Sequence, residues 1–136
     1  MINDKLTKEL QEQITDNKNA ILELIQNKPK IVNLWSGQKN TTGNITLDDD
    51  YDKYDIIGFT IAPNNTNNYY STSILSNDII IDGELTIGVF QKMNSGNPVS
   101  VSLVGRFTNK NTFNINSINC HTWNTCYLKR VFGIKL

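Results

Sequence analysis

The chain has 136 residues, enough for one domain, and its thirteen basic and thirteen acidic side chains cancel. This balance, without a basic patch, argues against nucleic acid as the principal partner. No apolar run reaches membrane-spanning length and the start lacks the pattern of a secretory signal, so we expect no membrane insertion and assembly in a cytoplasm.

The first thirty residues predict one amphipathic helix that ends at Pro29, because proline cannot continue a helix. Its apolar residues, together with Asn17, recur at alternating spacings of four and three residues. This spacing is typical of the a and d positions that form the seam of a coiled coil. This seam consists of Leu10, Ile14, Asn17, Ile21 and Leu24. A lone helix of this length is marginal in water, so we expect self-association. The alternative is a helix whose apolar stripe packs against its own domain.

Asn17 occupies a d position between the a-position residues Ile14 and Ile21. A buried amide in such a seam lowers stability and specifies register and strand number. The arrangement is similar to the polar layers of trimeric fibre stalks. We therefore expect residues 1–30 to form the stem of a homotrimer.

After Pro29 the sequence has no helical periodicity and predicts roughly seven to nine short strands separated by Gly, Asn and Pro turns. The expected strands cover residues 31–35, 44–47, 54–62, 78–81, 85–90, 99–107, 112–118 and 127–134. We expect the first two to form a hairpin, and the Asp82-Gly83 turn to join a second hairpin. In the strongest strand, Ile57, Phe59 and Ile61 share one face.

This pattern predicts a mainly β body over residues 31–136, folded as an antiparallel, jelly-roll-like β-sandwich. Two cysteines, Cys120 and Cys126, could face each other across a short hairpin. Free buried thiols are the preferred interpretation in a reducing compartment.

Three stretches of the body resemble one known family. Residues 34–37 read Leu-Trp-Ser-Gly, residues 54–55 read Tyr-Asp before the long strand, and residues 128–135 read Leu-Lys-Arg-Val-Phe-Gly-Ile-Lys. They resemble the carboxy-terminal head domains of phage tail fibres and baseplate receptor-binding proteins. Many such heads finish on Ile-x-Lys-Ile-Tyr-Gly-Ile-Lys, and here Val131 and Phe132 replace the Ile-Tyr pair conservatively.

The resemblance implies a homotrimer in the virion tail, in which a helical stem carries three β-sandwich heads and contacts other tail or baseplate proteins. It also implies adhesion to a host cell-surface saccharide, with no enzymatic activity and no cofactor. The alternatives are a structural connector without its own ligand and, less favoured, a polysaccharide depolymerase. The family shares no universal binding motif, so we expect Trp35 and Gly133 to be fold residues.

Saccharide binding requires an aromatic face together with amides and hydroxyls. Candidate saccharide-binding residues are Asn67, Asn68, Tyr69, Tyr70 and Trp123. For each aromatic residue, packing in the core is the competing interpretation.

Catalytic and metal-binding motifs are weak. His121 follows Cys120, but adjacent strand residues point to opposite faces, which argues against a thiol nucleophile. A zinc site that included Cys126 would lack a fourth ligand. The acidic residues 48–52 lack the glycine and distal glutamate of an EF-hand, so we expect a solvated turn there. We therefore predict no catalytic residue and no metal ligand.

Overall fold

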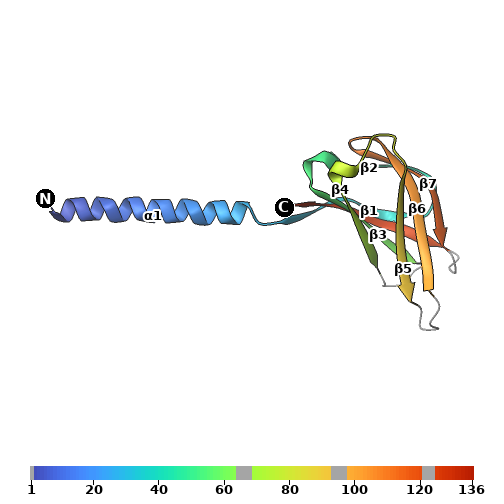
Figure 1. The fold of residues 1–136 in the computed structure, drawn as a ribbon, viewed down its shortest axis with the longest axis horizontal. Coiled ribbons are helices and arrows are strands. Elements are labelled where there is room, and N and C mark those ends of the chain that lie inside the picture. The colour runs from blue at the N-terminus through green and yellow to red at the C-terminus, as the bar shows by residue number, and fades with distance from the viewer. Residues whose placement is uncertain (1, 64–68, 93–97, 121–124) are drawn as a thin grey trace. The chain divides into compact units, whose positions relative to one another are not determined.

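The structure is a computed structural model that describes residues 2–63, 69–92, 98–120 and 125–136 (Figure 1). The chain divides into two compact units, and the boundary between them falls between Pro29 and Lys30. The first unit contains helix α1 (Ile2–Gln26), which confirms the predicted helix with slightly narrower bounds. Among the described residues, no helix combines the length and apolar character that a membrane span requires.

None of the residues of α1 is buried. The apolar side chains of the predicted seam are 57% to 70% exposed, and Asn17 is exposed among them. A helix in a protein gains most of its stability from packing its apolar face against other residues. The predicted seam, however, is solvent-exposed in the single chain.

The second unit is built from eight described strands in two antiparallel sheets (Figure 1). The strands are β1 (Lys30–Lys39), β2 (Gly43–Thr46), β3 (Ile56–Pro63), β4 (Tyr70–Leu75), β5 (Leu85–Lys92), β6 (Pro98–Asn109), β7 (Thr112–Cys120) and β8 (Cys126–Lys135). One sheet has the order β1-β8-β3-β4 and the other β2-β7-β6-β5. The predicted antiparallel, sandwich-like β body is thus confirmed.

The core lies between the two sheets and is centred on aromatic rings. Phe59 in β3 and Phe113 in β7 come from opposite sheets, and their ring centroids lie 5.2 Å apart. Phe113 also contacts Phe107 at 5.0 Å, and Phe107 contacts Tyr51 at 4.7 Å. As predicted, Ile57, Phe59 and Ile61 all face this core, because alternate strand residues point to the same side.

The expected hairpin of residues 31–35 with 44–47 is wrong. β1 pairs with β8 and β2 pairs with β7, so the two strands belong to different sheets. Leu34 and Ile45 are both buried and face the core from opposite sides. The polar turn between them therefore carries the chain from one sheet to the other, which its composition alone does not reveal.

The expected hairpin around Asp82-Gly83 is also wrong. Residues 76–78 form a short 3-10 turn, and residues 79–81 form no strand. The Ser76 hydroxyl donates to the Tyr54 carbonyl, and the Ile79 N–H donates to the Ser76 carbonyl at 3.1 Å. Asp82 does adopt the positive φ of a turn, at 63°, but its N–H donates to Phe107 in β6. Tertiary hydrogen bonds thus replace the local strand pairing.

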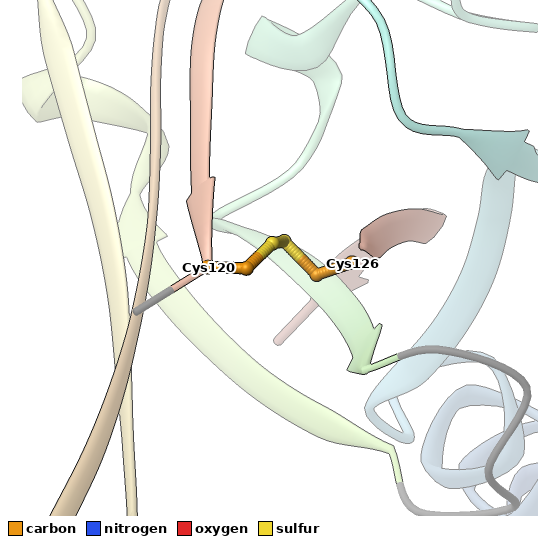
Figure 2. Close-up of a disulfide and its surroundings, with 2 residues drawn as sticks. All are labelled: Cys120 and Cys126. Atoms are coloured by element: carbon orange, nitrogen blue, oxygen red, sulfur yellow. A yellow bond between two sulfur atoms is a disulfide. The ribbon is translucent and has the colours of Figure 1, made fainter. Parts of the chain in front are cut away.

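The expectation of free thiols is corrected by a disulfide between Cys120 and Cys126 (Figure 2). Cys120 ends β7 and Cys126 begins β8, so the bond joins the two sheets rather than two strands of a hairpin. Neither sulfur carries a thiol in this state. Cys120 is therefore unavailable as the nucleophile or zinc ligand that its neighbour His121 suggested.

Replacing both Cys120 and Cys126 by alanine is expected to lower the free energy of unfolding by about 2 kcal/mol, because the bond restricts the unfolded chain over its six-residue separation. Urea unfolding followed by circular dichroism measures this change. A thiol reductant should shift the wild-type midpoint towards that of the double variant and leave the variant unchanged. Identical midpoints for oxidised wild type and variant would contradict a stabilising bond.

Candidate functional site

A groove of about 570 Å³ lies on the outer face of the β1-β8-β3-β4 sheet. Phe59 and Ile61 face the core, so Thr60 between them points away from the core and into the groove. The described lining residues are Ser36, Gly37, Gln38, Thr60, Tyr69, Ser71, Lys129 and Arg130. Each of the four strands of the sheet thus contributes at least one residue to this site, and Tyr69 lies directly before β4.

Two consecutive cations face this groove because β8 contains a bulge. Leu128 and Val131 are both fully buried although they are three residues apart, whereas regular alternation would send them to opposite faces. Opposite β3, the neighbours Thr60 and Ile61 pair with Arg130 and Leu128, which leaves Lys129 as the extra residue. The bulge thereby places Lys129 and Arg130 side by side on the outer face.

Arg130 is held in position by its neighbours. Its Nε donates to Asn33 Oδ1 at 2.8 Å, and Asn33 Nδ2 donates in turn to Ser36 Oγ at 2.7 Å. The guanidinium carbon lies 4.9 Å from the centroid of the Phe132 ring, a cation–π distance. These contacts orient the side chain, and no described residue accepts a hydrogen bond from the terminal nitrogens of the guanidinium, which can therefore act as donors.

The neutral part of the groove offers hydroxyls and one aromatic ring. Thr60 Oγ1 and Ser71 Oγ lie 2.8 Å apart and share one hydrogen bond, in which either can be the donor. Tyr69 is 58% exposed and lines the groove. No aspartate or glutamate is found among the described lining residues, so the groove carries a net positive charge.

The structure separates the two saccharide-binding candidates that it describes, Tyr69 and Tyr70. Tyr69 lines the groove, whereas Tyr70 is half-buried and packs against the core. Asn67, Asn68 and Trp123 lie outside the described residues, as does His121. The structure therefore brings only Tyr69 of the described candidates to this site.

Sequence reasoning missed the two cations and the hydroxyl pair of the groove. One signal for the cations exists: the apolar residues Leu128 and Val131 break the two-residue alternation of the last strand. A break of this kind indicates a bulge, and a bulge lets neighbouring side chains share a face. The partnership of Thr60 with Ser71 depends on the pairing of β3 with β4 and has no local signal.

The acidic turn of residues 48–52 forms ion pairs. Asp49 Oδ1 lies 2.8 Å from Lys53 Nζ, and Asp52 Oδ2 lies 2.7 Å from Lys110 Nζ. The hydrogen bond from Lys53 is the main reason that the pKa of Asp49 is lowered, and the Asp50 N–H also contributes. Among the described residues, no three His, Cys, Asp or Glu side chains gather at a metal-binding distance. Both carboxylates thus have a lysine as their counter-charge.

Trp35 and Gly133 both contact residues of the folded body. Trp35 is half-buried and packs against the core. Gly133 lies under the Tyr54 ring, where a Cβ would come within 2.4 Å of Cγ. Any larger residue at this position would displace the ring, which accounts for glycine there.

A second hollow of about 420 Å³ lies on the other sheet, lined by Ser100, Ser102, Asn119 and Cys120. Its described lining carries no charge. The positive groove is therefore distinguished by its cations and by its exposed aromatic ring.

No model of a known protein family matches the chain, and no similar protein was found among curated sequences.

Proposed function

We propose that this protein is a receptor-binding module of a phage tail, or of a phage-derived particle, that adheres as a homotrimer to a host cell-surface saccharide without cleaving it. The observation that carries this proposal is a helix with an exposed apolar stripe, directly followed by an antiparallel, sandwich-like β body. The resemblance of residues 34–37, 54–55 and 128–135 to phage head domains supports the same assignment.

The stem part of the proposal rests on the seam of α1. Three copies that press Leu10, Ile14, Ile21 and Leu24 together would bury side chains that are exposed in the single chain. The seam contains one polar layer, Asn17, which favours a defined strand number. The outer side of the same stem offers a docking surface for other tail or baseplate proteins.

The head part of the proposal includes a jelly-roll-like arrangement. The first strand pairs with the last, β1 with β8, and the second pairs with the next to last, β2 with β7. This nesting is consistent with the two-sheet architecture of jelly rolls. The positive groove with Tyr69, Thr60 and Ser71 supplies the aromatic face and hydroxyls that saccharide binding requires.

Trimerisation would make weak sites effective. A millimolar site corresponds to about 4 kcal/mol, but once one head is bound the next contact becomes intramolecular. Three heads on one stem can therefore hold a repetitive polymer firmly. Firm attachment by this route requires no covalent chemistry.

Light scattering and a glycan array on the purified full chain test the proposal. We expect a trimer mass and binding to at least one class of cell-wall saccharide. A trimer that binds no saccharide would support the structural connector instead. Shortening of a polysaccharide during incubation would support the depolymerase, for which the groove offers cations and hydroxyls rather than the usual pair of carboxyl groups.

Asn17→Ile is expected to raise the melting temperature of the stem by about 5 °C, because an apolar side chain replaces an amide that the proposed trimer would bury, at a gain of roughly 1 kcal/mol. The same change should broaden the distribution of oligomer masses, since the polar layer no longer selects one strand number. Circular dichroism at 222 nm and light scattering measure the two effects. Asn19→Ile makes the same chemical change on the outer side of the helix and is the control. Equal behaviour of the two variants would contradict the placement of Asn17 in the seam.

A further inference from the structure

We propose that the groove on the outer face of the β1-β8-β3-β4 sheet binds the anionic group of a charged saccharide, a phosphate or a carboxylate, between Lys129 and Arg130. This inference rests on the proposed function and specifies its ligand class. The sugar ring lies against Tyr69, and its hydroxyls reach the Thr60–Ser71 pair. The groove would thus recognise both the negative charge and the sugar ring of the ligand.

The charge argument starts from the bulge in β8. It brings Lys129 and Arg130 to the same face, where a regular strand would have separated them. Like charges on adjacent residues repel each other, and the described lining holds no carboxylate that offsets them. An anion bound between the two side chains relieves this repulsion and forms charge-assisted hydrogen bonds.

The geometry of Arg130 suits a planar or tetrahedral oxyanion. Asn33 Oδ1 accepts the hydrogen bond from Arg130 Nε, and the Phe132 ring packs against the guanidinium. The two terminal nitrogens then present parallel N–H donors, the arrangement that binds carboxylate or phosphate through two bonds. Because Arg130 is already oriented by these neighbours, less side-chain entropy is lost on binding.

The rest of the lining points to a saccharide as the carrier of the anion. Nucleic acid would require a long basic stripe, whereas this chain has equal numbers of acidic and basic residues and the groove has two cations. Ser36, Thr60 and Ser71 are small neutral donors and acceptors, suited to ring hydroxyls. The described lining of the hollow on the opposite sheet contains no cation, so we do not expect that hollow to select an anion.

The test uses the full chain and three polymer probes: phosphorylated dextran, polygalacturonate and unmodified dextran. Binding is measured by biolayer interferometry at low and at high salt. We expect binding to at least one anionic polymer, little binding to dextran, and weaker binding at high salt. The phosphate and carboxylate probes separate the two sources of negative charge.

The variant Lys129→Gln/Arg130→Gln should lose at least tenfold in affinity for the anionic polymer. The control Lys30→Gln/Lys135→Gln removes two charges from the same strand pair, where Lys30 and Lys135 are exposed partners, and should stay within about twofold of wild type. Arg130→Lys keeps the charge but removes the parallel donors, so we expect an intermediate loss. Unchanged melting temperatures verify that each variant is folded.

Three outcomes overturn the inference: equal binding to dextran and the anionic polymers, equal losses in the two double variants, or no binding to either anionic polymer. A glycan array separates this failure from failure of the proposed function. Binding of the array's neutral glycans would preserve saccharide adhesion while removing the anionic groove. No binding across the whole array would remove both.

Discussion

Replacing both Ile14 and Ile21 by aspartate is expected to convert the proposed trimer to a monomer at micromolar concentration. Both residues occupy a positions of the seam, so a trimer would bring six carboxylates into an apolar stem. The cost of desolvating them exceeds what the remaining apolar contacts can supply. Light scattering measures the mass directly.

The same substitution should reduce the proposed attachment to an immobilised cell-wall polysaccharide by about a hundredfold or more, because the three linked sites of the proposed trimer would become one. The head should keep its β-sheet circular dichroism, since its core lies wholly within residues 30–135. The control variant Thr15→Asp/Asn19→Asp adds the same charges on the outer side of the helix and should remain trimeric. A wild-type protein that is already monomeric would remove the basis of the proposed function.

Replacing Phe113 by alanine is expected to lower the free energy of unfolding of the head by about 4 kcal/mol. The side chain is fully buried and its ring contacts Phe59 of the facing sheet and Phe107 of its own sheet. Its loss would leave a cavity between the two sheets. Since small domains are stable by only about 5–15 kcal/mol, this one change removes a large part of the total.

Urea unfolding monitored by circular dichroism measures the loss. Tyr69→Ala removes an aromatic ring of similar size from an exposed position and should change the free energy of unfolding by less than about 1 kcal/mol. Phe113→Leu retains most of the apolar volume and should fall between the two. If Phe113→Ala unfolded at the wild-type midpoint, the rings would not be the centre of the core.

The elements that were predicted correctly are those with strong local periodicity. Spacings of three and four residues predicted the helix before Pro29, and alternation predicted the strand that contains Ile57, Phe59 and Ile61. Both patterns arise within a few turns or pleats of the chain and need no distant partner. The predictions of the two hairpins were wrong because turn residues indicate that the chain reverses but do not indicate which sheet it enters next.

The candidate site was predictable only in part. An aromatic residue beside polar groups led to Tyr69, because exposed aromatic residues in polar loops have a recognisable composition. The role of Arg130 could not be predicted from local composition, since its orientation depends on Asn33, which is 97 residues away in the sequence. The Thr60–Ser71 hydroxyl pair likewise exists only once β3 and β4 are aligned.

The sequence by itself determined that an amphipathic helix precedes a mainly β body, because hydrophobic spacing and proline act over a few residues. Only the tertiary structure decided that β1 pairs with β8, that Cys120 is bonded to Cys126 across the two sheets, and that the β8 bulge turns two cations into one groove. Each of these depends on strand register between distant segments, and register is set by how two faces pack together.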